Sequence, residues 1–240
     1  MLDKLLFIAL APILLCQGRK VRQTTLRLPE AAGARNGRAG QGKPLRLLIL
    51  GDSSAAGVGA STQEYALAGQ LAEQLSQQYQ VTWQVCAKSG LTNQQVLRKL
   101  DSLDRQEYDC VVLAVGVNDV TAGTNDALWL ARLQLLRDKL NAEFNVQHIF
   151  ISAIPPMQHF SALPRPLSDY LGRRARRLNR LSEQLAQAYN DLSFMPIQLG
   201  ASPDMLAADG FHPNEQAYSL WAEQLAVGIK SMQLQSTANK

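Results

Sequence analysis

The sequence predicts an α/β protein built on one parallel β-sheet with helices on both faces. The first observation behind this prediction is that short apolar runs alternate with helical segments from residue 45 onward. The second is that runs such as Leu47–Leu50 are apolar at every position, which is typical of strands buried on both faces. The third is the size of the chain. Its 240 residues, of which 46% are hydrophobic, are enough for one such domain with an additional segment.

Five strands and five helices are expected in alternation. The expected strands cover residues 45–51, 81–87, 108–116, 148–154 and 192–197. The expected helices cover residues 61–79, 92–103, 126–141, 168–189 and 214–232. Right-handed crossovers favour a flavodoxin-like doubly wound five-stranded parallel sheet in the order 2-1-3-4-5. In such a sheet, ligands bind beyond the carboxyl ends of the strands.

The chain divides into four parts by composition. They are an apolar N-terminal segment (1–18), a basic flexible linker rich in Gly, Ala and Arg (19–44), the α/β domain (45–234) and a C-terminal tail (235–240). Residues 1–46 hold nine of the 24 Lys and Arg residues and only two of the 20 acidic ones. The net charge of +4 therefore comes from the N-terminal region, and the domain itself is mildly acidic. Because the chain has no nucleic-acid-binding motif and few aromatic residues, we expect no nucleic-acid partner.

The N-terminal apolar run, Leu5–Cys16, leaves three alternatives open. Its twelve residues, at ~1.5 Å each, are too few to cross a hydrocarbon core of ~30 Å. Basic residues directly after the run favour a membrane-associated anchor. An exported, periplasmic or lipid-anchored protein is the second alternative, although Leu15 stands before Cys16 where a lipid-attachment signal needs a small side chain. The third is that the run does neither.

Polar residues follow the expected strands where a doubly wound sheet binds its ligands. Ser53 comes after the first strand, Gly90 after the second and Asn118 after the third. Asp209 stands three residues before His212, just ahead of the last helix. Together they supply a hydroxyl, a tight backbone turn, a carboxamide, a carboxylate and an imidazole, which are the groups that acyl transfer needs.

The motifs around these residues resemble those of the SGNH hydrolase, or GDSL esterase/lipase, family. GDSSAAGVG, the glycine of AKSGLTN, GVND and DGFHP occur in the family order, from residue 51 to 213. The resemblance implies Ser53 as nucleophile, His212 as base and Asp209 as the carboxylate that orients it. It also implies an oxyanion hole from the backbone N–H groups of Ser53 and Gly90 and the side-chain amide of Asn118. The second motif rests mainly on Gly90.

The residues themselves discriminate between neighbouring candidates. Ser53 stands where the chain leaves the strand, whereas Ser54 is one position further and is expected to be a local turn hydroxyl. Of the other two histidines, His148 begins a strand and is expected to be structural. His159 lies in a loop after the fourth strand, either on the surface or beside a substrate groove.

The predicted function is that of a serine hydrolase without a cofactor or metal, acting on carboxylic ester, or alternatively thioester, bonds of a small molecule or lipid. An acyltransferase or a carbohydrate deacetylase would use the same residues. A non-catalytic, membrane-tethered binding module is the alternative from another class, and the intact set of catalytic residue types argues against it. A helix rich in arginine is either a solvated face or a surface for anionic lipid or a phosphorylated acyl carrier. Its basic residues are Arg173, Arg174, Arg176, Arg177 and Arg180.

Overall fold

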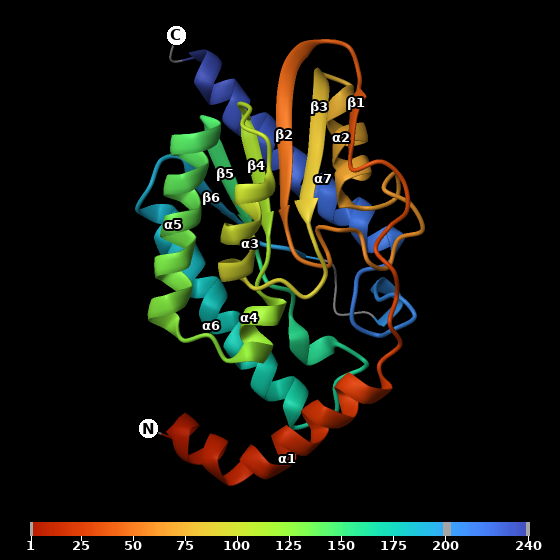
Figure 1. The fold of residues 1–240 in the computed structure, drawn as a ribbon, viewed down its shortest axis with the longest axis vertical. Coiled ribbons are helices and arrows are strands. Elements are labelled where there is room, and N and C mark those ends of the chain that lie inside the picture. Colours follow the sequence, from red (N-terminus) through yellow and green to blue (C-terminus); the bar gives the residue numbers. More distant parts are fainter. Residues whose placement is uncertain (1, 199–202, 239–240) are drawn as a thin grey trace.

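The computed structural model describes residues 2–198 and 203–238 (Figure 1). In these residues six strands form one sheet, in the order β1-β3-β2-β4-β5-β6. The strands are β1 (Asn36–Ala39), β2 (Lys43–Gly51), β3 (Tyr79–Ala87), β4 (Cys110–Ala114), β5 (His148–Ser152) and β6 (Leu192–Met195). β1 pairs antiparallel with β3, and all the other pairs are parallel.

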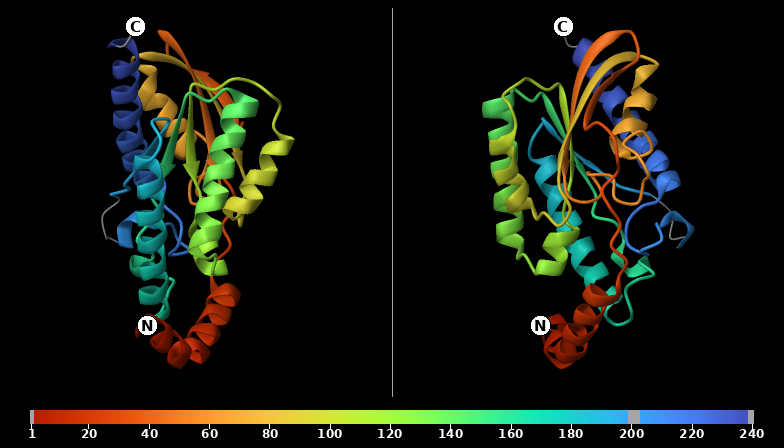
Figure 2. Two further views of the ribbon diagram at one scale, coloured as in Figure 1. Left: turned by 90° about the vertical axis from the view of Figure 1, so that its left-hand side faces the viewer. Right: turned by 45° about the vertical axis from the view of Figure 1, so that its right-hand side comes forward.

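The five parallel strands have the predicted order, and the helices cover both faces of the sheet (Figure 2). Helices α2 and α7 pack on one face, and α3, α5 and α6 pack on the other. The helices are α1 (Leu2–Thr24), α2 (Leu67–Ser76), α3 (Asn93–Lys99), α4 (Val117–Ala122), α5 (Asp126–Phe144), α6 (Leu167–Gln187) and α7 (Glu215–Ala238). Apolar side chains are buried on both sides of the sheet, which explains the uninterrupted apolar strands.

The strand register brings three chain exits to one level. Gly51, the last residue of β2, lies opposite Ala87 at the end of β3 and Ala114 at the end of β4. The segments that follow these strands therefore leave the sheet side by side. They carry Ser53, Gly90 and Asn118.

The segment predicted to be a flexible linker contains regular elements in the structure. Helix α1 continues to Thr24, and β1 forms a sixth, antiparallel strand at the sheet edge. The small residues of this segment serve close packing: a Cβ atom on Gly37 would lie 2.8 Å from the ring of Trp83. Gly40 has φ +75° in the turn between β1 and β2, a conformation that favours glycine.

The first helix of the domain is shorter than predicted. It was expected over residues 61–79, but α2 begins at Leu67. Residues before it pair with the N-terminal segment, since Ala32 N donates to Ser61 O (3.2 Å) and Gln63 N donates to Ala32 O (2.7 Å). These groups are then unavailable for helical bonds. Two further differences are that α4 was not predicted and that α7 continues through residues 235–238 of the predicted tail.

Helix α1 lies beyond the carboxyl ends of the parallel strands, across the start of α6 (Figure 1). The side chain of Gln17 donates to Arg165 O (2.8 Å) and accepts from Leu167 N (3.2 Å). Leu14 is buried against the main core, whereas Ile13 and Leu15 are exposed. Within the described residues, no helix combines the length and the apolar character that crossing a membrane requires.

Candidate active site

Ser53 stands in a tight turn directly after β2. Ala56 N donates to Asp52 O and Val58 N donates to Ser53 O, each at 3.0 Å, so the turn has helical character. Its far side is held by the buried hydroxyl of Tyr218, which lies 2.7 Å from Val58 O and 3.1 Å from Ser54 O. The backbone around Ser53 is thereby fixed.

The imidazole of His212 lies between the Ser53 hydroxyl and the Asp209 carboxylate. His212 Nε2 is 2.9 Å from Ser53 Oγ, and His212 Nδ1 is 2.5 Å from Asp209 Oδ2. With the proton on Nδ1, the ring donates to Asp209 and accepts from Ser53, which is the arrangement of a nucleophile, a base and an orienting group. The fold thus brings His212 of the Asp-x-x-His motif into hydrogen-bond distance of Ser53, which is 159 positions away in the sequence.

The Asp209 carboxylate is held in its charged form. Its side chain is 1% exposed. Burial works against the charge, but hydrogen bonds from the His212 ring and from the backbone N–H groups of His212 and Phe211 outweigh it and hold the pKa of Asp209 below its usual range. The two backbone donors lie 3.0 Å and 2.9 Å from Oδ1. The loop therefore orients the carboxylate independently of the imidazole.

Asn118 lies in the first turn of α4. Gly116 precedes that helix with φ +141°, a value open to glycine, and lets β4 turn sharply into it. The Asn118 amide donates to Leu91 O at 3.0 Å and to Asp52 Oδ2 at 3.4 Å. The first bond ties Asn118 to the loop that carries Gly90, and the second is long.

Gly90 lies in the exposed loop after β3, with φ +85° and no atom within 4 Å of the position a Cβ would take. Lys88 N approaches Gly51 O at 3.4 Å, so the loop runs beside the end of β2. The structure thus brings Ser53, His212 and Asp209 into one hydrogen-bonded chain. It sets the loops of Asn118 and Gly90 next to them.

Asp52 is a site residue whose environment the sequence did not reveal. Its residue surface is 2% exposed, and its carboxylate accepts from Ser54 N at 3.2 Å as well as from Asn118. Burial raises the pKa of Asp52 to about 7, against the effect of its hydrogen bonds from Ser54 and Gly116. The adjoining cavity, between the ends of β4 and β5 and Trp221, measures about 20 Å³. This is room for about one water molecule and not for an acyl chain.

The other two histidines lie outside the hydrogen-bonded chain. His148 is buried, with Nε2 2.8 Å from Ser193 Oγ, and burial lowers its pKa, as befits a structural residue. His159 is exposed. The loop that follows it nevertheless reaches the site, because Phe160 packs against Phe211 with ring centroids 4.8 Å apart.

Two of the arginines of α6 contact the neighbouring α4–α5 region, and four are exposed, Arg177 being both. Arg174 donates to Thr124 O (2.9 Å), and Arg177 pairs with Asp126 (2.6 Å from Nε to Oδ2) at the start of α5. The exposed ones are Arg173, Arg176, Arg177 and Arg180. Part of this basic face therefore serves packing between helices. Among the described residues, no three His, Cys, Asp or Glu side chains gather in a manner that would hold a metal ion.

A parallel doubly wound sheet with these four segments at its carboxyl edge defines an SGNH-type hydrolase fold. Residues 49–220 match the model of the GDSL-like lipase/acylhydrolase family. The chain belongs to this family.

Known relatives agree with this assignment. The GDSL-like esterase Rv1075c of Mycobacterium tuberculosis (strain ATCC 25618 / H37Rv) is 27% identical over 201 residues, which are 78% of this chain and 62% of that protein. The chain thus spans less than two thirds of this relative's length. The structure of TesA is similar with a TM-score of 0.64 and 23% identity, over 78% of this chain and 98% of that one. The structure of the psychrotrophic esterase EstA from Pseudoalteromonas sp. is similar with a TM-score of 0.57 and 24% identity, over 78% of this chain and 98% of that one. At these identities, the two structures support the fold.

Proposed function

We propose that this protein is a serine hydrolase that cleaves carboxylic ester bonds through an acyl-enzyme. The observation that carries the proposal is the hydrogen-bonded chain from Ser53 Oγ through His212 to Asp209. Family membership supports the same reaction class. A serine hydroxyl is a weak nucleophile, and an imidazole in this position activates it.

In the acylation step, Ser53 Oγ attacks the ester carbonyl carbon and its proton passes to His212 Nε2. The imidazolium that forms is stabilised by the Asp209 carboxylate, which is already charged and oriented. When the tetrahedral intermediate collapses, the carbon–oxygen bond to the alcohol breaks and His212 returns the proton to that alcohol. A water molecule then attacks the acyl-enzyme, with His212 again as base, and releases the acid and free Ser53.

The negative oxygen of the tetrahedral intermediate needs donors that are in place beforehand. We assign this role to the backbone N–H groups of Ser53 and Gly90 and to the Asn118 amide. The short bond to Leu91 O orients that amide, while the long 3.4 Å contact with Asp52 occupies its second hydrogen only weakly. The second hydrogen is the one available to the oxyanion.

The nucleophile is tested with a serine-directed fluorophosphonate. We expect wild type and Ser54→Ala to be labelled and to hydrolyse short p-nitrophenyl esters, and Ser53→Ala to do neither. The Ser54 control is matched because this neighbour shares the turn but lies outside the hydrogen-bonded chain. Labelling that persists in Ser53→Ala would sink the assignment.

The acyl acceptor and acyl donor are tested with a substrate panel of p-nitrophenyl esters, acyl-CoA thioesters and acetylated sugars. Thioester hydrolysis, acyl transfer and carbohydrate deacetylation would use the same Ser53, His212 and Asp209. One similar structure is the carbohydrate acetylesterase Est24 from Sinorhizobium meliloti, with a TM-score of 0.59 and 15% identity over 78% of this chain and 99% of that one. Preferential turnover of acetylated sugars would reassign the substrate class but retain the mechanism.

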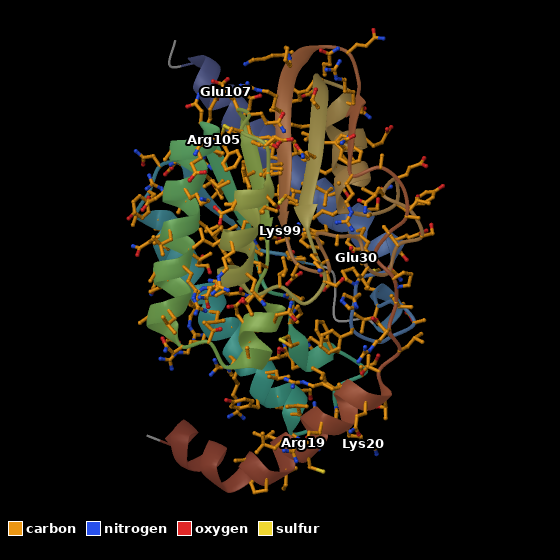
Figure 3. All side chains as sticks on the ribbon, viewed as in Figure 1. Arg19, Lys20, Glu30, Lys99, Arg105 and Glu107 are labelled. Carbon is orange, nitrogen blue, oxygen red and sulfur yellow. The ribbon has the colours of Figure 1, made fainter. Side chains whose placement is uncertain are left out.

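We also propose that α1 attaches the enzyme to an anionic membrane surface. Its outer side exposes Ile13 and Leu15, and the basic residues Arg19 and Lys20 follow on the same helix (Figure 3). Apolar side chains that enter the interface and cations that meet acidic headgroups act together in such helices. Because α1 lies at the end of the molecule where the strands end, attachment there would turn the site toward the lipid.

A further inference from the structure

The loop that carries Gly90 has few contacts of its own. Lys88, Ser89 and Gly90 are all exposed, and nothing lies within 4 Å of the Gly90 Cβ position. The backbone bonds from Lys88 N to Gly51 O and from Leu91 N to Lys88 O are both long, at 3.4 Å. Packing and backbone pairing alone therefore hold this loop weakly.

Besides the 3.0 Å bond from the Asn118 amide to Leu91 O, two charged residues of the N-terminal segment make short contacts to this loop. Glu30 Oε1 accepts from Ser89 N at 2.6 Å, and Arg35 Nη1 donates to Ala87 O at 2.8 Å. Glu30 and Arg35 also form an ion pair with each other. The pair thus contacts the loop at two points, at the end of β3 and at Ser89 beside Gly90. Hydrogen bonds with a charged partner are roughly twice as strong as neutral ones.

Glu30 is charged in this position. Partial burial disfavours the charge, but hydrogen bonds from Ser89 and Arg35 outweigh it and hold the pKa of Glu30 below its usual range. Arg35 is itself anchored, because its carbonyl accepts from Val85 N (2.7 Å) next to the pairing of β1 with β3. Arg35 thus connects the edge of the sheet at β1 with the loop that carries Gly90.

The same segment also contacts the turn of the nucleophile. The Gln63 side chain donates to Ala31 O at 3.2 Å and to Ala56 O at 3.1 Å. Gly57, in that turn, lies so close to Ala31 that a Cβ atom would approach its Cβ to 2.7 Å. Residues 30–35 therefore lie against both the turn that presents Ser53 and the loop that presents Gly90.

We propose that Glu30 and Arg35 are positioning residues of the oxyanion hole, which hold the Gly90 loop at a fixed distance from Ser53. Both lie outside residues 49–220, the part matched by the family, so this chain supplies a support from its N-terminal segment. The inference rests on the proposed function, since it concerns the donors of that reaction. A displaced donor weakens stabilisation of the transition state more than binding of the substrate, so the effect belongs in kcat.

The test compares Glu30→Gln with Glu107→Gln in the full chain. Glu107 is a matched control, because it accepts from Arg46 Nη1 at 2.7 Å and lies well away from Glu30, toward the end of the molecule opposite α1 (Figure 3). We expect Glu30→Gln to lower kcat on a short p-nitrophenyl ester by about tenfold with KM little changed. Glu107→Gln should leave both unchanged. An alkylboronic acid, which forms a tetrahedral adduct with a serine, should lose affinity for Glu30→Gln in the same ratio as kcat/KM falls.

Two further measurements separate positioning from general stability. Hydrogen exchange in residues 87–91 should quicken in Glu30→Gln and not in Glu107→Gln, at an unchanged Tm. Arg35→Met should reproduce the kcat loss, and the double variant should lose no more than either single one if the pair acts as a unit. If wild type is active, is inactivated by Ser53→Ala, and keeps its kcat in Glu30→Gln, the positioning role is overturned and the proposed function stands. A wild type that neither hydrolyses esters nor reacts with fluorophosphonate would overturn both.

Discussion

At the scale of single residues, the distances among three side chains predict which histidine acts as the base. His212 is the histidine 2.9 Å from Ser53, and Asp209 fixes its ring. We expect His212→Ala to lower kcat by roughly 10⁴-fold or more, and Asp209→Asn to be nearly as severe because an asparagine amide would favour the wrong tautomer. Steady-state kinetics on a short ester measures both.

The matched controls are the remaining histidines. His148→Ala removes a buried contact with Ser193, and His159→Ala removes an exposed side chain. Both variants should keep most of the activity per folded molecule. Should His159→Ala be the inactive variant instead, the assignment of the base would be wrong.

The buried Asp52 carboxyl leads to a prediction about how the stability of the fold depends on pH. Since its folded pKa, about 7, lies above the ordinary value, the folded state binds the proton more tightly than the unfolded chain. The protonated Asp52 therefore stabilises the folded state, fully at a pH below the ordinary pKa of an aspartate, and this stabilisation is lost as pH rises toward 7. Asp52→Asn, which cannot ionise, should therefore gain stability relative to wild type as pH rises from 4 to 8, by up to a few kcal/mol.

Chemical unfolding of both proteins across that pH range measures the difference. His148 acts in the opposite sense, because its lowered pKa makes stability rise with pH up to its unfolded value, but it contributes equally to both proteins. A difference between the two proteins that stays constant with pH would show that Asp52 is ionised throughout. The comparison thus isolates one buried carboxyl.

At the scale of elements, β1 and the segment before it determine where the chain can be shortened. Removing residues 1–28 deletes α1 but keeps Glu30, Arg35 and β1, so hydrolysis of soluble esters should persist. Removing residues 1–44 also deletes β1 and the contacts with both site loops. We expect this longer deletion to lower Tm by several degrees and kcat by at least about tenfold.

The two truncations are compared by thermal unfolding and ester hydrolysis side by side. Equal activity in both would mean that the N-terminal segment is dispensable and that the domain begins at residue 45. Loss of activity already in the shorter deletion would instead assign a catalytic contribution to α1, through Gln17 and its contacts with residues 165 and 167.

At the scale of the whole molecule, charge and shape predict where the enzyme works. Full-length protein should co-sediment with vesicles containing phosphatidylserine, and binding should weaken as salt screens the charges, over ~8 Å at physiological ionic strength. Arg19→Glu with Lys20→Glu should reduce binding, since each nearby cation adds about 1 kcal/mol. The same charge change made by Lys99→Glu with Arg105→Glu should have little effect, because both residues lie away from α1 (Figure 3).

Mass spectrometry of the N-terminus of the protein from cells separates attachment from export. Protein that retains residue 1 or 2 excludes cleavage, and vesicle binding then tests attachment through α1. A mature chain that begins after residue 15, or carries lipid on Cys16, would replace the proposal with the export alternative. Equal vesicle binding by the two charge variants would also contradict it.

The sequence by itself determined the parallel sheet, its order and the identity of the candidate site residues. Continuous apolar runs report burial on both faces, a local property that composition carries directly. Four short motifs in the order of the GDSL family, each placed after an expected strand or before the last helix, allowed Ser53, Asn118, Asp209 and His212 to be named as candidates without coordinates.

Only the tertiary structure shows where the N-terminal segment packs and that Asp52 is buried. Residues 29–44 are rich in Gly, Ala and Arg, a composition typical of a linker, but β1 is stabilised by a partner strand more than forty positions away. The start of α2 was misplaced for the same reason, since its backbone groups pair with Ala32. Likewise, burial of Asp52 and the reach of Glu30 and Arg35 to the Gly90 loop depend on contacts between distant segments. Local periodicity carries no information about such pairings.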